Sequence, residues 1–292
     1  MTISTADPAE LLTRATRTLD GLVGRESIKA AVDELRRTVE EASDDETQPK
    51  NLVFTGPLGT GKSLVAQIVA DIYAGTGVIE SPTVHSVSER DLAGRYWDDP
   101  LAKVDEAVNA ALGGILYIDE ASRICIGATG GVDSSGPAVL DALLDAMHTH
   151  SRQLVVILAG YNDEMTPFLA GDERLTTVFP ASLEFESYTA ADIADITAVI
   201  AAREGDRITA KAKTAIRVAV QTKIDRATPR KYPIIDRFAN ARLSNQIYRR
   251  STERRTHRLA TMEAADITRA ATRTLDITDV QPATVKILSM RH

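Results

Sequence analysis

The chain has 292 residues, of which 43% are hydrophobic and 26% are charged, so it can build one large or two smaller cores. A net charge of −7 argues against a general nucleic-acid binder, which usually carries a basic surplus. The single cysteine, Cys125, excludes an intramolecular disulfide, and no apolar run is long enough to span a bilayer. The N-terminus does not have the pattern of a secretory signal, so we expect a cytoplasmic protein.

The first half of the chain alternates between strand and helix patterns. Two helices, 8–20 and 27–41, come first, and a polar loop over 43–50 follows them. The expected strands are 51–55, 83–87, 115–118, 154–159 and 183–185. Helices are expected over 62–74, 101–112 and 137–150. Because the strands are continuous apolar runs, we predict an α/β fold with a buried parallel sheet and helices on both faces.

The strand pattern stops near Ser187, and the chain then changes character. From Thr189 onward we find helical periodicity over 190–203, 209–224 and a long stretch, 234–262, while 276–290 is mixed. We therefore predict two domains. Residues 1–188 form the α/β domain, including N-terminal helices within 1–42, and residues 189–292 form an all-helical domain.

A phosphate-binding loop is the clearest motif. Residues 51–63 join an apolar strand to the spacing G-x4-G-K-[ST], and an apolar helix follows. Here glycine N–H groups can cradle phosphates, while Lys62 reaches the β- and γ-phosphates and Ser63 ligates Mg²⁺. A plain glycine-rich turn is the alternative, which this strand–loop–helix context disfavours. The expected nucleotide contacts are Gly56, Pro57, Leu58, Gly59, Thr60, Gly61, Lys62, Ser63 and Leu64.

Two adjacent acids follow the apolar strand 115–118. In a protein with a phosphate loop, an acid at the carboxyl end of a neighbouring strand holds Mg²⁺, and we assign this role to Asp119. Glu120 is then placed to activate a water for attack on the γ-phosphate. Alone the pattern is weak, since acids often end buried strands. Combined with the loop, it predicts an ATP site that uses Mg²⁺.

Three further features each have two interpretations. Arg242 is either a surface arginine or a guanidinium that reaches the phosphates. Trp97 is either buried by packing or, with the adjacent Tyr96 on an extended loop, one of two side chains that point in opposite directions, one exposed and one an anchor. The basic stretch 249–258 is either a solvated face paired with acids or a docking surface for an acidic neighbour. Its arginines are Arg249, Arg250, Arg254, Arg255 and Arg258.

Together these motifs resemble an AAA+ ATPase, and in particular the branch that holds the CbbX red-type Rubisco activases and the EccA ATPases of type VII secretion. The resemblance covers about residues 20–262. The matching segments are Gly21–Gly24, Phe54–Pro57, Asp91–Tyr96, Ala111–Ala121, Leu140–Leu144, Leu154–Tyr161 and Phe238–Arg242.

The resemblance implies an ATP-driven ring, usually a hexamer, that grips a protein client. It implies that Tyr96 and Trp97 belong to a pore loop, and that Val23 and Gly24 contact the nucleotide. It also implies that Arg242 is the sensor on a helical lid. A second sensor would be Tyr161 or Asn162 at the end of strand 154–159, and Asn162 is the chemically more usual choice to orient the attacking water.

The chain departs from this family where arginine fingers are expected. Thr176 and Val178 stand where the family has two arginines that reach a neighbouring subunit. Such a finger can be worth several orders of magnitude in turnover. Arg174 and Arg123 are nearby substitutes, although neither is in register.

Two functions therefore remain open from the sequence. The first is a remodelling ATPase that binds MgATP, hydrolyses it in a ring and acts on a protein client. The second is an ATP-binding structural or regulatory subunit with slow, partner-dependent hydrolysis, which works only within a mixed ring. A DNA-associated protein is a weaker third interpretation, supported by the stretch 249–258 alone, and we expect neither nucleic-acid binding nor membrane insertion.

Overall fold

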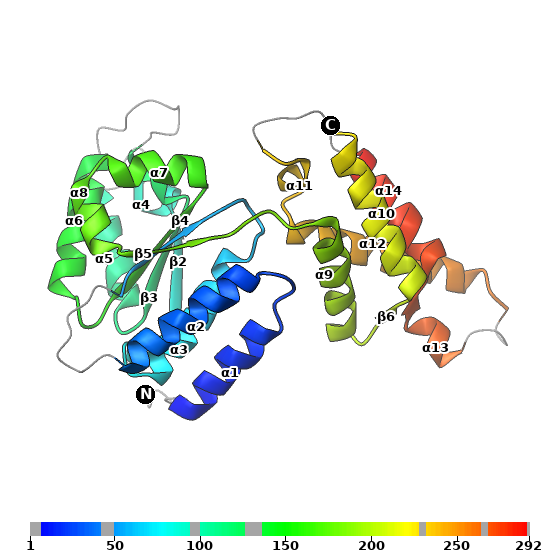
Figure 1. The fold of residues 1–292 in the computed structure, drawn as a ribbon, viewed down its shortest axis with the longest axis horizontal. Helices are drawn as coiled ribbons and strands as arrows, with labels where there is room; N and C mark the ends of the chain where they lie inside the picture. The colour runs from blue at the N-terminus through cyan, green and yellow to red at the C-terminus, as the bar shows by residue number, and fades with distance from the viewer. Residues whose placement is uncertain are drawn as a thin grey trace. The chain divides into compact units, whose positions relative to one another are not determined.

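A computed structural model describes residues 7–41, 50–93, 100–125, 136–227, 232–263 and 268–290 (Figure 1). The chain forms two compact units. The α/β unit consists of residues 1–56 and 61–185, and the helical unit consists of residues 57–60 and 186–292. Four residues of the phosphate loop thus belong with the helical unit, a feature that the sequence pattern does not reveal.

The α/β unit is built on a five-stranded sheet in the order β2-β3-β4-β1-β5, with every pair parallel. The strands are β1 (Leu52–Thr55), β2 (Val84–Ser88), β3 (Ile115–Asp119), β4 (Val155–Gly160) and β5 (Ala181–Glu184). Side chains of β1 alternate between two cores: Leu52 and Phe54 pack in one, and Val53 packs in the other. The inner strands β1, β3 and β4 are almost wholly apolar because both of their faces are covered, whereas the edge strands β2 and β5 also carry polar residues. The predicted fold class is confirmed.

Helices supply the two layers that cover this sheet. The core with Phe54 also contains side chains of α1 (Pro8–Asp20), α2 (Glu26–Glu41) and α3 (Lys62–Gly75). The core with Val53 draws on α5 (Pro100–Ala111), α6 (Gly136–Thr149), α7 (Asn162–Ala170) and α8 (Glu173–Val178). A short α4 (Glu89–Ala93) and the 3-10 helix η1 (Ala121–Cys125) complete the unit.

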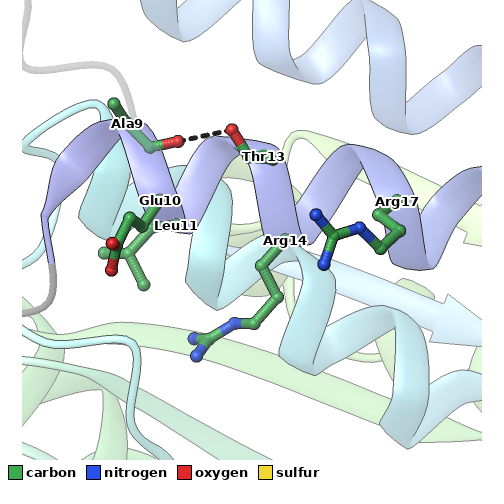
Figure 2. A pocket seen from close by; sticks show the side chains of 6 residues that line it. All are labelled: Ala9, Glu10, Leu11, Thr13, Arg14 and Arg17. Atoms are coloured by element: carbon green, nitrogen blue, oxygen red, sulfur yellow. Dashed lines mark hydrogen bonds between the residues drawn. The ribbon is translucent and has the colours of Figure 1, made fainter.

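Helix α1 is attached to α3 by a two-point ion pair. The Arg14 Nε and Nη2 atoms donate to the two Asp71 carboxylate oxygens at 2.7 and 2.6 Å, and Gln67 donates to the same carboxylate at 3.2 Å. Asp71 is only 3% exposed, so these bonds compensate for its buried charge. A surface pocket of 460 Å³ lies along α1, and Arg14 and Arg17 line it (Figure 2).

The helical unit packs its helices around one core, which includes Ile193, Ile216, Leu243 and Val280. Its helices are α9 (Ala190–Arg203), α10 (Ala210–Asp225), α11 (Ile234–Arg237), α12 (Ala241–Ala260), α13 (Arg269–Thr272) and α14 (Ile277–Ser289). Two short parallel strands, β6 (Arg207–Ile208) and β7 (Thr274–Leu275), pair within it. The predicted helical domain is confirmed, and this short strand pair is its one addition among the described residues.

Two sequence predictions in this unit need correction. The helix predicted over 234–262 is broken between α11 and α12, because Ala239 and Asn240 adopt φ values of 55° and 50° that a helix cannot contain. The mixed stretch 276–290 is mostly helix α14, which begins at a capping box formed by Asp276 and Asp279.

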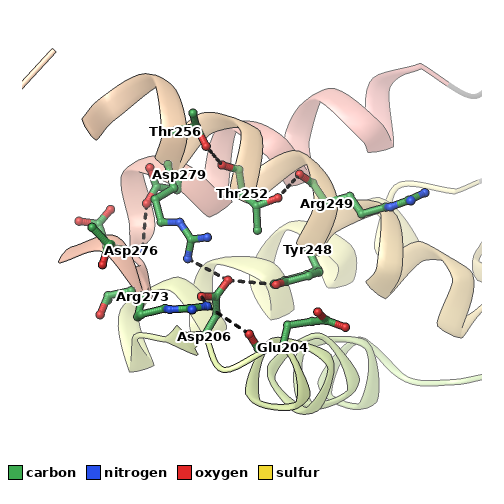
Figure 3. Close-up of polar contacts among 12 residues, drawn as sticks. Glu204, Asp206, Tyr248, Arg249, Thr252, Thr256, Arg273, Asp276 and Asp279 are labelled. Carbon is green, nitrogen blue, oxygen red and sulfur yellow. Dashed lines mark hydrogen bonds and ion pairs between the residues drawn. The ribbon is translucent and has the colours of Figure 1, made fainter. Parts of the chain in front are cut away.

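A buried carboxylate, Asp206, ties several elements of the helical unit together (Figure 3). It lies 2.8 Å from Arg255 and 3.6 Å from Arg273, and Tyr248 donates a hydrogen bond to it at 3.0 Å. Asp279, also buried, pairs with Arg258 at 2.8 Å. For Arg255 and Arg258 the interpretation of arginines paired with acids is confirmed. Among the helices that the structure describes, none is long and apolar enough to cross a lipid bilayer.

Candidate nucleotide site

The phosphate loop connects β1 to the start of α3, as the motif predicts. Gly56 has a φ of 142°, and a Cβ atom there would lie 2.2 Å from the Phe185 carbonyl oxygen. Any side chain at this position would therefore clash with backbone. At the other end of the loop, Gly61 is the N-cap of α3 and offers no side-chain acceptor to the first turn. The backbone N–H groups of the first turn of α3 therefore have no side-chain cap and can bind an anion such as phosphate.

Lys62 is 8% exposed, and its Nζ atom donates to the Gly56 carbonyl oxygen at 2.6 Å. The Lys62 ammonium group thus contacts the backbone of the phosphate loop, within which it is predicted to bind phosphate. Ser63 donates a hydrogen bond of 3.4 Å to the Tyr117 hydroxyl, which places the start of α3 beside β3. Burial raises the pKa of the Tyr117 phenol, so the hydroxyl stays neutral and can accept this bond.

Asp119 and Glu120 follow at the end of β3, two residues beyond Tyr117. Ser63 and Asp119 supply a hydroxyl and a carboxylate, which are ligands that Mg²⁺ accepts beside phosphate and water oxygens. Among the described residues, no group of three or more His, Cys, Asp or Glu side chains could hold a metal ion. Nucleotide-bound Mg²⁺ usually takes only one or two ligands from the protein, and waters and phosphates fill its other positions. Ser63 and Asp119 therefore fit the ion.

Glu120 has an unusual backbone and a paired side chain. Its φ is 55°, and its N–H donates to the Asp119 carboxylate at 3.1 Å. Its own carboxylate lies 2.9 Å from Arg123 Nη1, and Arg123 Nε lies 3.9 Å from Glu164. Ser122 donates to Glu164 at 3.1 Å. Sequence reasoning missed Glu164, because nothing in its helical pattern links it to β3.

The two arginines considered as substitute fingers are both paired within the chain. Arg174 lies 2.6 Å from Asp172 and 2.7 Å from Asp141, and these bonds raise the pKa of its guanidinium. Arg123 is paired with Glu120, as described above. Both guanidinium groups are therefore bound to acids of the same chain in this conformation.

The predicted sensors lie in different units. Asn162 is the first residue of α7, and its amide donates to the Glu184 carboxylate at 2.8 Å. Arg242 is the second residue of α12; it is exposed, and no ion pair or hydrogen bond of its side chain occurs among the described residues. Their predicted roles stay predictions.

Three other groups of predicted residues remain, and the structure does not test their roles. Val23 and Gly24 lie in the turn between α1 and α2, where Gly24 has a φ of 62°. Leu64 is 42% exposed on the first turn of α3. The predicted pore-loop residues Tyr96 and Trp97 lie outside the described residues.

The turn before α12 contributes residues that sequence reasoning overlooked. Asn240 is fully buried and donates from Nδ2 to the Leu58 carbonyl oxygen at 3.1 Å. The Ala241 N–H donates to the Gly59 carbonyl oxygen at 3.1 Å. The segment Phe238–Arg242 matches the family, but the resemblance assigns a role only to its charged residue, Arg242. Asn240 and its partner Leu58 are 182 residues apart, so no local sequence pattern indicates that the two are in contact.

Comparisons with known proteins agree with this architecture. The profile of the ATPase family associated with various cellular activities (AAA) matches residues 52–182, and that of the AAA lid domain matches residues 189–288. Among solved structures, the FIGL-1 AAA domain has a TM-score of 0.59 at 17% identity and covers 94% of this chain and 83% of its own. The Thermotoga maritima RuvB motor has a TM-score of 0.58 at 14% identity, over 89% of this chain and 68% of its own. These structures support the fold alone.

Curated relatives are more similar. The ESX-1 secretion system protein EccA1 of Mycobacterium leprae is 33% identical over 262 residues, covering 87% of this chain and 46% of its own length. The ESX-3 secretion system protein EccA3 of Mycolicibacterium smegmatis is 32% identical over 292 residues, covering 96% and 48%. The chain thus spans about half the length of the curated relatives that it matches. The resemblance to EccA proteins is confirmed, while that to CbbX stays a prediction. With a matching ATPase profile, a matching lid profile and this sheet order, the chain belongs to the AAA ATPase family.

Proposed function

We propose that this chain binds MgATP and hydrolyses it, and that it uses the energy to remodel a protein client. The observation that carries the proposal is the strand–loop–helix at Gly56–Ser63, with the Asp119–Glu120 strand end beside it through the Ser63–Tyr117 bond. Bound MgATP supplies the γ-phosphate that is transferred to water. Lys62 binds the phosphates, Ser63 and Asp119 hold the metal, and Glu120 accepts the proton of the attacking water.

Assembly and client are proposed from the family and from the relatives' names. AAA proteins suggest an oligomer, and we propose a ring in which Tyr96 and Trp97 grip a polypeptide. The EccA relatives are named as secretion system proteins, so a secretion component is the client class we favour. The proposed location is cytoplasmic.

A second function is favoured by the arginine pairing. Arg174 is bound by Asp172 and Asp141, and Arg123 is bound by Glu120, so this conformation presents no finger at either candidate position. In this alternative the chain binds ATP tightly and turns it over slowly until a related subunit supplies the arginine.

The test combines binding and turnover. We expect wild-type protein to bind a fluorescent ATP analogue in Mg²⁺, and Lys62→Ala to lose that binding. Glu120→Gln should bind as tightly as wild type but release phosphate at least about a hundredfold more slowly, because it lacks the general base. Glu34→Gln, an exposed glutamate on α2, serves as the control and should behave as wild type. Wild type that binds no ATP would refute the proposal, while tight binding with negligible turnover would select the alternative.

A further inference from the structure

The side-chain amide of Asn240 forms hydrogen bonds with three different segments of the chain. Its Oδ1 atom accepts from the Tyr188 N–H at 2.9 Å. Its Nδ2 atom donates to the Leu58 carbonyl oxygen at 3.1 Å and to Asp236 Oδ1 at 2.9 Å. Since Tyr188 offers a donor and Leu58 an acceptor, these partners fix which way the amide points. One buried side chain therefore joins the phosphate loop to the segment that enters α9.

The backbone on either side of Asn240 makes a second contact with the loop. The Ala241 N–H donates to the Gly59 carbonyl oxygen at 3.1 Å. A Cβ atom on Gly59 would lie 2.1 Å from the Ala239 carbonyl oxygen, so the loop rests directly on this turn. Residues 57–60 form one compact unit with the turn, which is consistent with both contacts.

The conformation of Asn240 indicates that its side chain is needed. Its φ of 50° and ψ of −118° lie in a region that glycine enters easily and other residues rarely adopt. An asparagine at such a position accepts backbone strain, which persists only where surrounding contacts over-determine it. The three amide bonds are contacts of this kind.

The two contacts also orient the loop's donors. In a trans peptide the carbonyl and the next N–H point in opposite directions. Because Asn240 holds the Leu58 carbonyl, the Gly59 N–H points to the opposite side of the chain. Because the Ala241 N–H holds the Gly59 carbonyl, the Thr60 N–H likewise points away from that contact. Anion-binding loops work by presenting successive N–H groups in this way.

We propose that Asn240 is a positioning residue for nucleotide binding. Its side chain holds the Leu58 carbonyl and so sets the direction of the Gly59 N–H in the phosphate loop. Through Tyr188 it couples the state of the loop to the segment that precedes α9. This inference rests on the proposed ATP site and deepens it, because it assigns a role to a residue that does not contact the nucleotide.

The test compares Asn240→Gly with Ser187→Ala. Glycine keeps the backbone conformation and removes all three amide bonds. The control removes a neighbouring bond, from Ser187 Oγ to Asp236 at 2.6 Å, and leaves the Leu58 contact intact. We expect the Kd of a non-hydrolysable ATP analogue to rise about tenfold in Asn240→Gly, which is typical of a buried acceptor left unpaired, and less than twofold in Ser187→Ala. Melting temperatures measured on both variants separate this effect from a loss of stability.

Equal affinity in wild type and Asn240→Gly would overturn the inference while leaving the ATP site intact, and wild type that binds no analogue would refute the proposed function instead. A measurement on wild type remains decisive if the glycine variant fails to fold. The analogue should slow amide exchange in a peptide that contains Tyr188, because coupling is reciprocal. Unchanged exchange there would also overturn the inference.

Discussion

At the scale of single residues, the side chain of Glu120 is the most informative. Its carboxylate pairs with Arg123, a partner three residues further along on η1, and both side chains are about 40% exposed, at 38% and 41%. A carboxylate that accepts a proton from water must turn one of its oxygens toward that water. In this conformation the Glu120 carboxylate, which the proposed mechanism uses as the general base, is held by its ion pair with Arg123.

We therefore expect Arg123→Gln to raise the rate of ATP turnover at saturating ATP. An exposed ion pair is worth up to about 1 kcal/mol, so the increase should reach at most about fivefold. Phosphate release under steady-state conditions measures it. Arg37→Gln, which removes an exposed pair on α2, is the control and should leave the rate unchanged. A lower rate in Arg123→Gln would mean that Arg123 assists the reaction instead of restraining Glu120.

At the scale of elements, the sheet could be predicted from the sequence and the turn before α12 could not. The strands were predictable because burial on both faces leaves a continuous apolar run, as in Ile115–Ile118. The break between α11 and α12 was hidden because Ile235, Ala239 and Leu243 keep a four-residue apolar spacing through it. Only the backbone angles of Ala239 and Asn240 show that the helix ends and restarts.

The candidate site also has parts that could be predicted from the sequence and parts that could not. The motif at Gly56–Ser63 and the acids at Asp119 and Glu120 were predictable because phosphate and Mg²⁺ demand particular residues at fixed spacing. The pairing of Arg174 with Asp141 was not predictable, since the two residues come from separate helices. Contacts of this kind depend on packing, for which a single sequence contains no local signal.

Tyr248 on α12 links that helix to Asp206 and leads to a prediction about alkaline pH. Burial and the hydrogen bond to Asp206 raise the pKa of the Tyr248 phenol to about 12, from an ordinary value of 10.0. A raised pKa means that the folded state retains the proton more tightly than the unfolded chain. The stability that this proton contributes is complete below about pH 10 and is lost as the pH rises toward 12.

The free energy of unfolding should therefore fall less steeply in Tyr248→Phe than in wild type between pH 10 and 12. Below pH 9 the variant should be less stable by about 1 kcal/mol, because it lacks the hydrogen bond. Urea titrations followed by circular dichroism measure both quantities. Tyr232→Phe, at a tyrosine that is 42% exposed, is the control. Parallel pH curves for wild type and Tyr248→Phe would contradict the assignment.

At the scale of the whole molecule, the missing fingers make assembly the central question. The α/β unit contains Gly56, Lys62 and Ser63 of the phosphate loop and the acids Asp119 and Glu120. Arg123 and Arg174, in the same unit, are both paired internally. A site completed by a neighbouring subunit responds to concentration, whereas a site complete within one chain does not.

We expect the ATP turnover rate per chain to rise with protein concentration between about 0.1 and 10 μM, a range in which many oligomers assemble. Sedimentation at the same concentrations should show the oligomer growing in parallel. Glu120→Gln, measured at every concentration, corrects for contaminating ATPases. A flat rate together with a growing oligomer would indicate that the ring needs an arginine from a different subunit.

The contact between Leu58 and Asn240 also has a consequence for synthesis on the ribosome. The two residues are 182 positions apart, and chains grow at about 5–20 residues per second, so Leu58 waits about 10–40 s for its partner. A nascent chain can already hold strand β1 and helix α3 during this interval, but its loop carbonyls have no anchor. During synthesis the contact that anchors the phosphate loop can therefore form only after every strand of the five-stranded sheet has been translated.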